Sequence, residues 1–351
     1  MRKVFAHLCT WFSTKDYSGV WEMWNSDYDN SPHNPETIQF DGRRDIAANA
    51  YPLSGLYDSA DYHAIRMQFS LMRECGIDGV IVDYDGYRLN RNRYEKFLKI
   101  LPLLKEYGLK LVVCLEEWCG YYPTGTFKNR EDEITAFCNE FQHLAELCFN
   151  DNYYTEEDRP VVFIFRKCPD QWYSADEWEI VKNRLSSYRS KFYFNDCYDN
   201  TMVTVADGYY FWVGGFDSSN NSNTLDYCKK ELQTYNKRLK EINAKAYVPS
   251  VVPGFDDSKV WGWGDGARIA PRYEGKRYEL MWNQAIESGE KLIQIVTWND
   301  WNEGSYVEPC TAYGYEYLNM TKQFICMLKN TKYSDSELVF RKIIESFKNK
   351  K

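Results

Sequence analysis

Short apolar runs alternate with amphipathic stretches along the whole chain. Eight runs have the length and the β-branched or aromatic content of strands, and they lie at 4–12, 79–84, 110–118, 160–165, 191–196, 208–213, 246–252 and 292–300. Apolar residues at three-to-four spacing predict helices over 61–76, 92–108, 131–149, 174–188, 225–243, 278–289 and 313–329. No clear helix separates the fifth run from the sixth, so one repeat is expected to be irregular.

Strands that alternate with helices favour a parallel sheet with helices outside it. Eight such units predict an α/β fold, the (β/α)8 or TIM barrel. The rival is a doubly wound open sheet, but no glycine-rich phosphate-binding turn follows the first strand. No segment rich in Pro, Gly or Ser divides the 351 residues, so residues 1–351 are predicted to form a single domain.

Aromatic residues are unusually abundant, at 17% of the chain with 29 Tyr and 12 Trp. Such rings suit a surface that stacks on flat apolar faces, which sugars and nucleobases both present. The formal net charge of −8 argues against nucleic acid, because phosphate binding needs a basic surface. Composition therefore favours a carbohydrate partner, an oligosaccharide or a polysaccharide. It leaves the oligomeric state open.

The cysteines and histidines show no metal-site spacing, so no metal and no cofactor is predicted. The 11 cysteines are an odd number spread through predicted strands and helices, and buried reduced thiols are expected. The apolar start is broken by His7 and lacks a small-residue cleavage site. No apolar run has the length of a membrane span. A cytoplasmic protein is expected, or one expressed without its signal.

Acids and tryptophans recur where the predicted strands end, which in a barrel is where the chemistry lies. These positions are Asp83, Tyr84, Asp85, Glu116, Glu117, Trp118, Asn195, Asp196, Trp212, Asp256 and Asp257. Any one of these acids alone is more often a solvated loop residue. Their recurrence predicts an anionic floor with walls of stacking rings.

The last run ends in the most unusual stretch, WNDWNEG at 298–304. Asp300 and Glu303 are three apart, which on a continuing strand sends them to opposite faces. Two amides and a glycine in the same stretch permit a sharp turn, after which both carboxyls face the barrel mouth. Two close carboxyls walled by Trp298 and Trp301 suit glycosidic cleavage, in which one donates a proton and the other is base or nucleophile. The alternative is an acidic turn with a tryptophan lid.

The stretch IQIVTWNDWNEGSYVEP (293–309) resembles the last-strand signature of glycoside hydrolase families 71 and 99 and of the WbsX-type proteins of polysaccharide biosynthesis. Residues 50–87 resemble the segment that joins strand one to strand two in that group. VVCLEEW (112–118) resembles the third strand of family 99. VPSVVPGFDD and the later ARIAPRYEGKRYELMWNQAI resemble its seventh strand, arginine-bearing loop and following helix. The resemblance covers most of the chain in order.

Resemblance to family 99 implies a (β/α)8 retaining endo-α-mannosidase or mannanase. It implies that Asp300 deprotonates the substrate's own 2-hydroxyl, forming an anhydro-sugar, and that Glu303 is the general acid and base. Family 99 has a glutamate where this chain has Asp300. Family 71, whose members are inverting α-1,3-glucanases, has aspartate there. The tail EGSYVEPCTAYGYEYL looks more like the WbsX group, so the sugar and the stereochemical outcome stay open.

The resemblance also implies substrate-binding residues. Glu116 stands at the place of a functional glutamate that ends the third strand. Arg272, or else Arg268, stands where an arginine binds a substrate hydroxyl, with a surface salt bridge as the alternative. Tyr84 and Trp118 are expected to form sugar platforms, with core packing as the alternative.

Three functions remain open at this point. The sequence favours hydrolysis of α-glycosidic bonds within an oligosaccharide or polysaccharide. The second is transfer in glycan assembly, and the third is a barrel that binds sugar without catalysis. The intact pair of Asp300 and Glu303 argues against the third, because a binding protein does not need both acids.

Overall fold

The computed structural model describes residues 2–26, 32–87, 90–120, 129–166, 173–195, 197–213 and 224–350. The chain forms two compact units. The first comprises Met1–Asp78, Val213–Leu232 and Ser250–Lys351, and the second comprises Gly79–Trp212 and Gln233–Pro249. Whether the whole chain behaves as one domain stays a prediction.

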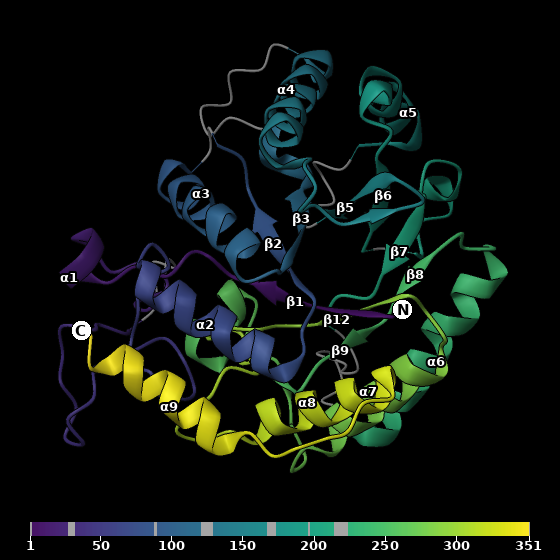
Figure 1. The fold of residues 1–351 in the computed structure, drawn as a ribbon. Helices are drawn as coiled ribbons and strands as arrows, with labels where there is room; N and C mark the ends of the chain where they lie inside the picture. Colours follow the sequence, from purple (N-terminus) through teal and green to yellow (C-terminus); the bar gives the residue numbers. More distant parts are fainter. Residues whose placement is uncertain are drawn as a thin grey trace. The chain divides into compact units, whose positions relative to one another are not determined.

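The first unit contains a short parallel sheet in the order β1-β12-β9 (Figure 1). Its strands are β1 (Lys3–Leu8), β12 (Leu292–Ile295) and β9 (Ser250–Val251). These strands are buried almost along their whole length, as the apolar runs predict for parallel strands. An antiparallel pair, β10 (Phe255–Asp256) with β11 (Ile269–Ala270), also lies in this unit.

Five α-helices of the first unit are described: α1 (Lys15–Ser18), α2 (Tyr62–Cys75), α7 (Lys276–Glu287), α8 (Glu316–Lys329) and α9 (Glu337–Lys348). Helix α2 packs against α8 and α9, and α7 packs against α8 and β9 (Figure 1). The side chain of Asp61 caps the start of α2 by accepting a hydrogen bond from the backbone of His63. Gly76 follows the helix at a φ of 82°, a left-handed conformation that glycine adopts readily, and the predicted end of the helix at residue 76 agrees with it.

The second unit contains six parallel strands in the order β8-β7-β6-β5-β3-β2. They are β2 (Gly79–Tyr84), β3 (Lys110–Glu116), β5 (Arg159–Phe165), β6 (Lys191–Phe194), β7 (Gly208–Tyr210) and β8 (Tyr247–Val248). A two-residue strand, β4 (Thr155–Glu156), pairs with β5 in the antiparallel sense. Because parallel strands end at the same edge, Glu116 and the residues after β5 and β6 are neighbours there.

The helices of the second unit are α3 (Arg91–Glu106), α4 (Arg130–Cys148) and α5 (Ala175–Arg184). Helix α6 (Leu225–Glu241) begins in the first unit and continues in the second. Short 3₁₀ turns are η1 (Glu117–Gly120), η3 (Ser186–Tyr188), η4 (Asn200–Thr204) and, in the first unit, η5 (Ser258–Gly264). Only η4 lies between β6 and β7, so the predicted irregular repeat is confirmed among the described residues.

The predicted runs 4–12, 110–118, 191–196 and 208–213 extend two to four residues beyond the observed strands. Two other runs differ more. The run 246–252 forms two separate strands, β8 and β9, with Pro249 between them. Proline has no N–H for a sheet ladder, so it interrupts the run. The run 292–300 leaves the sheet at Ile295, five residues earlier than predicted, and the stretch 298–304 is therefore entirely outside the strand.

The cysteines among the described residues are free thiols, and all of them except Cys326 are buried. The expectation of buried reduced thiols is confirmed for these residues. Cys168, one of the 11 cysteines, and Asp196, one of the predicted strand-end acids, lie outside the described residues. Within the described ranges, the helices include none with the length and apolar character needed to cross a membrane.

Candidate active site

The stretch 298–304 folds into the sharp turn that its sequence predicts. The backbone N–H of Asp300 donates to Thr297 Oγ1 at 2.8 Å, and that of Glu303 donates to Asp300 Oδ1 at 3.1 Å. Gly304 ends the turn at a φ of 65°. A Cβ atom there would lie 2.9 Å from the carbonyl oxygen of Asp256, so only glycine fits without movement of the backbone.

The two amides of this stretch anchor the turn. Asn299 pairs with the backbone of Cys9, accepting from its N–H at 2.8 Å and donating to its carbonyl at 2.9 Å. The side chain of Asn302 donates to the carbonyl oxygens of Met23 and Ala47 at 2.8 and 2.9 Å. Both asparagines are buried. They tie the turn to the end of β1 and to the long segment that follows it.

A buried tyrosine joins the turn to the residues after it. The hydroxyl of Tyr57 accepts from Asn299 Nδ2 and Trp301 Nε1, each at 3.1 Å, and donates to Glu308 Oε2 at 2.8 Å. Burial raises the pKa of Glu308 to about 8, so this acid is largely protonated at neutral pH. The ring of Trp301 also stacks on Tyr306 with centroids 4.1 Å apart.

The two acids of the turn differ in exposure. Asp300 is 4% exposed, whereas Glu303 is half-buried. Oε1 of Glu303 accepts a hydrogen bond from the indole of Trp263 at 2.9 Å. Trp263 is not among the residues predicted from the sequence, although the VWGWG pattern around it, with two tryptophans each followed by glycine, marks an unusual segment.

Trp263 lies in a strained segment. Trp261 and Trp263 have φ values of 50° and 57°, in the left-handed region that residues with a Cβ rarely adopt. Such conformations cost roughly 1–3 kcal/mol each and gather at ligand-binding and catalytic sites. Trp261 is 62% exposed. The strained segment therefore presents aromatic surface beside the carboxylate of Glu303.

Trp298 and Trp301 were expected to wall the acids. Both rings are completely buried in the described structure. The backbone of Trp298 donates to the carbonyl of His7 at 2.7 Å, so this residue holds the turn against β1. Their contribution here is packing around the turn, and direct stacking on a sugar stays a prediction.

Arg272 fixes the backbone that follows Glu303. Its guanidinium donates to the carbonyl oxygens of Gly304 and Tyr306 at 2.9 and 2.8 Å. It also lies 4.4 Å from the ring centroid of Tyr317 and 4.5 Å from that of Tyr313. The alternative of a surface salt bridge does not describe this buried arginine, which is 8% exposed. Its contact with substrate stays a prediction.

Arg268, the other arginine considered for this role, is bound to an acid instead. Its guanidinium donates to Oδ2 of Asp257 at 2.7 Å, and its backbone N–H donates to Oδ1 of the same residue. Asp257 is completely buried, and the Arg268 side chain is 34% exposed. The salt-bridge alternative therefore describes Arg268.

A chain of buried polar side chains crosses the sheet of the first unit. His7 Nε2 lies 2.7 Å from Gln294 Oε1, and Gln294 Nε2 donates to Ser250 Oγ at 2.7 Å. Since the amide oxygen of Gln294 is an acceptor, His7 Nε2 carries the proton in this arrangement. Burial lowers the pKa of His7 to about 3, so the ring stays neutral at physiological pH.

Three predicted site residues lie in the second unit. Glu116 is the last residue of β3, is 7% exposed, and accepts from the indole of Trp118 at 2.8 Å. Trp118 is half-buried. Tyr84 ends β2, is 3% exposed, and packs edge-on against Phe97 with centroids 5.2 Å apart. This contact supports the packing alternative for Tyr84, and a platform role for either ring stays a prediction.

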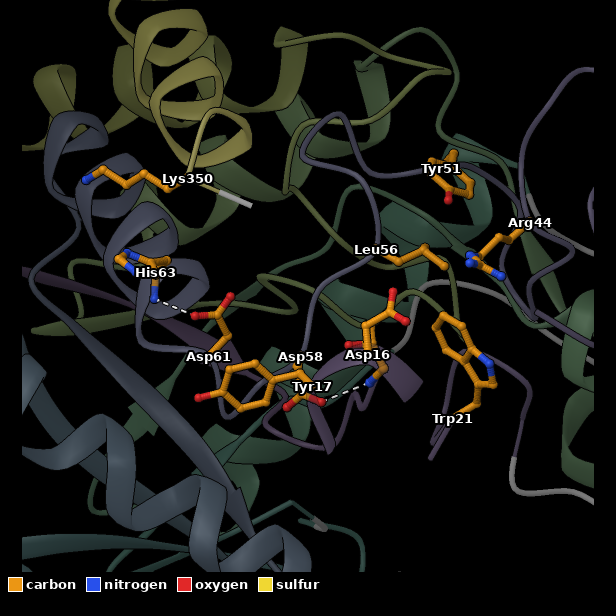
Figure 2. A pocket seen from close by; sticks show the side chains of 11 residues that line it. Asp16, Tyr17, Trp21, Arg44, Tyr51, Leu56, Asp58, Asp61, His63 and Lys350 are labelled. Atoms are coloured by element: carbon orange, nitrogen blue, oxygen red, sulfur yellow. Dashed lines mark hydrogen bonds between the residues drawn. The ribbon is translucent and has the colours of Figure 1, made fainter. Parts of the chain in front are cut away.

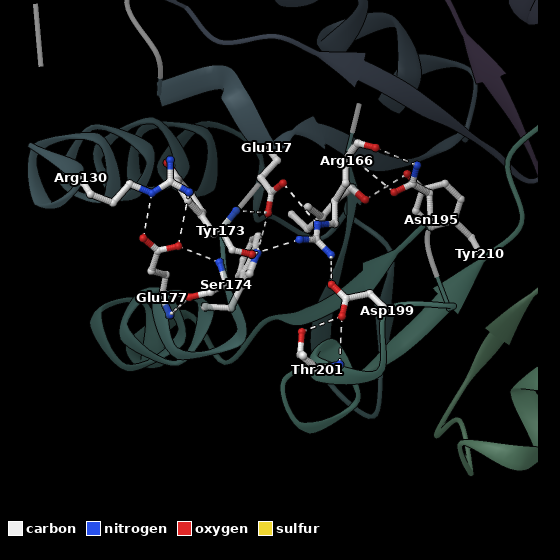
Figure 3. Close-up of polar contacts among 12 residues, drawn as sticks. Glu117, Arg130, Arg166, Tyr173, Ser174, Glu177, Asn195, Asp199, Thr201 and Tyr210 are labelled. Atoms are coloured by element: carbon white, nitrogen blue, oxygen red, sulfur yellow. Dashed lines mark hydrogen bonds and ion pairs between the residues drawn. The ribbon is translucent and has the colours of Figure 1, made fainter. Parts of the chain in front are cut away.

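A buried ion pair stands beside Glu116 in sequence (Figure 3). Oε2 of Glu117 lies 3.3 Å from Arg166 Nε, and both side chains are almost completely buried. Oε1 of Glu117 accepts from Trp178 Nε1 at 2.7 Å and from the backbone of Tyr173 at 3.2 Å. Burial raises the pKa of Glu117, and Arg166 opposes that shift.

Arg166 extends this network to two further strand ends. It donates to Asp199 Oδ2 at 3.2 Å, and its backbone N–H donates to Asn195 Oδ1 at 3.0 Å. Arg166 follows β5, and Asn195 follows β6. The network therefore connects the ends of β3, β5 and β6 within the second unit (Figure 3).

The structure thus groups the predicted residues by unit. Asp300, Glu303, Trp298 and Trp301 share one turn, to which Arg272 is bonded. Glu116 and Trp118 are bonded to each other in the second unit, which also contains Tyr84. Over the ranges that are described, no three His, Cys, Asp or Glu side chains are arranged to hold a metal ion.

Comparison with known proteins identifies the family of this chain. Residues 2–335 match Glycosyl hydrolase family 99. The chain belongs to this family. The resemblance to family 99 that the stretch 293–309 indicated is confirmed. The chain is a glycoside hydrolase, and its substrate is a glycan.

Two vertebrate mannosidases are similar to this chain. It is 23% identical over 336 residues to a glycoprotein endo-alpha-1,2-mannosidase of Xenopus laevis, covering 85% of this chain and 68% of that protein. It is 22% identical over 335 residues to the Mus musculus protein of the same name, covering 85% of this chain and 66% of that protein. The chain therefore spans about two thirds of these vertebrate relatives.

A solved family 99 structure confirms the fold. The GH99 endo-alpha-mannosidase from Bacteroides thetaiotaomicron superposes with a TM-score of 0.68 at 20% sequence identity. The match covers 94% of this chain and 98% of that one. The predicted α/β fold, the (β/α)8 barrel, is confirmed by this likeness.

Proposed function

We propose that this family 99 glycoside hydrolase cleaves α-linked mannose chains internally, with Asp300 and Glu303 as its catalytic carboxylates. The named activities of its relatives support the substrate class. The hydrogen bonds within the turn support the assignment of Asp300 and Glu303 as the catalytic pair. Its amides and Trp301 bond to the surrounding framework, while the N–H of Glu303 bonds to the side chain of Asp300.

In this proposal Glu303 is the general acid. Its proton passes to the leaving glycosidic oxygen, which takes the electron pair of the breaking bond to the anomeric carbon. The indole of Trp263, which donates to Glu303 Oε1 at 2.9 Å, holds the carboxyl in one orientation. Partial exposure of Glu303 gives a glycan access to this group.

Asp300 is the base of the first step. The family resemblance supports removal of the proton from the substrate's 2-hydroxyl, whose oxygen then bonds to the anomeric carbon. Water next opens this anhydro-sugar as Glu303 accepts the water proton and Asp300 returns its proton to the 2-oxygen. The anomeric configuration is retained overall. Asp300 is one methylene shorter than the family glutamate, so the alternative is activation of a water molecule with inversion.

The test is a product analysis. The protein is incubated with α-linked mannan and glucan oligosaccharides, and new reducing ends are measured against Asp300→Asn and Glu303→Gln proteins. The proposal expects cleavage of the mannan by the unsubstituted protein alone. Products longer than the substrate would show transfer instead of hydrolysis, and cleavage of glucan alone would overturn the substrate class.

The stereochemical course is read from the same reaction. Proton NMR of the first product follows its anomeric configuration before mutarotation. Retention, together with failure to cleave a 2-deoxy substrate, supports the 2-hydroxyl as the target of Asp300. An inverted first product would assign water activation to Asp300.

A further inference from the structure

A pocket of about 470 Å³ lies in the first unit (Figure 2). Its lining comes from α1 and the residue before it, the segment between α1 and α2, the start of α2, and Lys350, which follows α9. None of its lining residues belongs to the stretch 298–304. Its volume is in the range of small-molecule sites, which are about 300–1,000 Å³.

Three aromatic rings form part of its wall. Tyr17 is 48% exposed, and Trp21 and Tyr51 are half-buried. Figure 2 shows Trp21, Arg44 and Tyr51 together on one side of the pocket. Exposed rings at a concave surface leave apolar area in contact with water, and a flat ligand face would cover it.

The orientation of Trp21 is fixed by two contacts. Its indole N–H donates to Glu36 Oε1 at 2.8 Å, and the guanidinium of Arg44 lies 5.2 Å from its ring centroid. Arg44 is itself held, because it donates to the carbonyl of Pro35 at 2.7 Å. The ring is therefore set in place before any ligand arrives, which reduces the entropy cost of binding.

The lining of the pocket includes two buried side chains, Asp58 and Leu56. Asp58 is 2% exposed, and its two carboxylate oxygens accept from the backbone of Thr14 and Ala60 at 2.9 and 2.8 Å. Leu56 is also buried. The backbone thus holds the carboxylate of Asp58 in place within the lining.

The charges around the pocket nearly balance. Asp16, Asp58, Asp61, Arg44 and Lys350 line the pocket. His63 lies on the side opposite Trp21 (Figure 2). An anionic ligand would need an excess of cations, and a lipid chain would need an apolar lining. Sugar hydroxyls both donate and accept hydrogen bonds, so acids and bases beside aromatic rings match a neutral saccharide.

We propose that this pocket is a second saccharide-binding site, separate from the site that contains Asp300 and Glu303. The proposal goes beyond hydrolysis, because it assigns binding to residues outside the acid turn. It rests on the proposed function only in the choice of an α-linked mannose oligosaccharide as the first ligand to test.

The test is calorimetric titration of the 351-residue chain carrying Glu303→Gln with an α-linked mannotetraose and, separately, an α-linked glucotetraose. The proposal expects two binding sites for at least one of these sugars. Adding Trp21→Ala weakens one site by about tenfold or more, as truncation of a buried aromatic anchor does. Trp21→Phe keeps much of the binding because it keeps a ring, and Tyr17→Ala provides a second probe if Trp21→Ala misfolds.

Tyr333→Ala is the matched control, because Tyr333 is 39% exposed and does not line the pocket. It should leave both sites unchanged. One binding site, or two sites that neither Trp21→Ala nor Tyr17→Ala weakens, would overturn the pocket proposal. So would the absence of binding by both sugars. The proposed hydrolysis is judged separately, by the reducing ends that protein with an intact Glu303 releases.

Discussion

The hydroxyl of Tyr57 donates a 2.8 Å hydrogen bond to Glu308 across 251 residues of sequence. The same oxygen accepts from Asn299 and Trp301, which flank Asp300. One buried hydroxyl thus joins the segment after β1, the acid turn and the segment after that turn. The position of Asp300 depends on the Tyr57 hydroxyl, because the residues on either side of Asp300 both donate to that oxygen.

Removing that hydroxyl should loosen the turn. Tyr57→Phe leaves the donors of Asn299 and Trp301 without this acceptor in a buried site. A buried polar group that loses its partner costs roughly 1–3 kcal/mol. We expect a loss of this size in the free energy of unfolding, measured by urea denaturation, and a lower kcat at temperatures where the fold is intact.

Tyr84→Phe is the matched control for Tyr57→Phe. Tyr84 is also buried, but its hydroxyl has no hydrogen-bond partner among the described residues. Its removal should therefore cost little or no stability. Equal losses for the two variants would show that the Tyr57 bonds do not stabilise the turn.

Glu308 should make the stability of the protein depend on pH. The pKa of Glu308 is about 8 in the folded chain, against an ordinary value of 4.5. The folded state therefore holds a proton that the unfolded state has lost, and stability falls as pH rises from 4.5 to 8. His7 acts in the opposite sense, since its pKa is lowered from 6.5 to about 3 and its effect appears only below pH 6.5.

Between pH 6.5 and 8, Glu308 contributes to the pH dependence of stability and His7 does not. In that window we expect the free energy of unfolding to fall by up to about 1.4 kcal/mol per pH unit from this carboxyl. Glu308→Gln should flatten the slope, because the amide keeps an acceptor for Tyr57 but does not titrate. Glu279→Gln, on the exposed face of α7, is the control and should not change it. An unchanged slope in Glu308→Gln would contradict the raised pKa.

Gly304 should tolerate no side chain. Gly304→Ala places a methyl group 2.9 Å from the carbonyl oxygen of Asp256 at a φ of 65°. We expect about 1–3 kcal/mol of destabilisation from the contact, in addition to the cost of the backbone conformation. Displacement of the adjacent Glu303 should also reduce kcat. Thermal unfolding and initial rates measure the two effects.

Gly314→Ala is the control that distinguishes the cost of a positive φ from the cost of a steric contact at the Cβ atom. Gly314 has a φ of 55°, but a Cβ atom there meets nothing within 4 Å. This variant should lose only about 1 kcal/mol or less and keep its activity. If it is as damaging as Gly304→Ala, crowding against Asp256 is not the reason that glycine is needed after Glu303.

Replacing only one partner of the Glu117–Arg166 ion pair should lower the free energy of unfolding substantially. Arg166→Met leaves the carboxyl of Glu117 buried without its cation, and such changes cost roughly 3–5 kcal/mol. The double variant Arg166→Met with Glu117→Gln should recover part of that loss. Urea denaturation of the four proteins of this cycle measures the coupling. No recovery in the double variant would show that the two side chains do not stabilise the fold as a pair.

Much of the fold follows from local pattern in the sequence. The run 79–84 predicts the bounds of β2, and the predicted helix over 131–149 differs from α4 by one residue at each end. Periodicity succeeds there because apolar spacing is a property of neighbouring residues. It failed at 246–252, where Pro249 separates two short strands that pair with different neighbours. Helix α9 (Glu337–Lys348) was also missed.

The site was less predictable because its bonds are long-range. The sequence predicts a turn at 298–304, and the structure confirms it. The same stretch gives no sign that Asn299 pairs with Cys9, 290 residues away, or that Trp263 reaches Glu303. Tyr57 and Glu308 were overlooked for the same reason. The chemical roles of Asp300 and Glu303 stay predictions.

The most direct test of those roles compares two substrates of the Glu303→Gln protein. One is an α-mannan oligosaccharide, whose leaving oxygen needs a proton, and the other is an aryl α-mannoside chain with a leaving group that does not. The account predicts that the first bond cleavage slows by about a hundred- to ten-thousand-fold on the oligosaccharide, while the first turnover of the activated substrate is largely kept. Equal loss on both substrates, with sugar binding and folding intact, would contradict the assignment of Glu303 as the general acid.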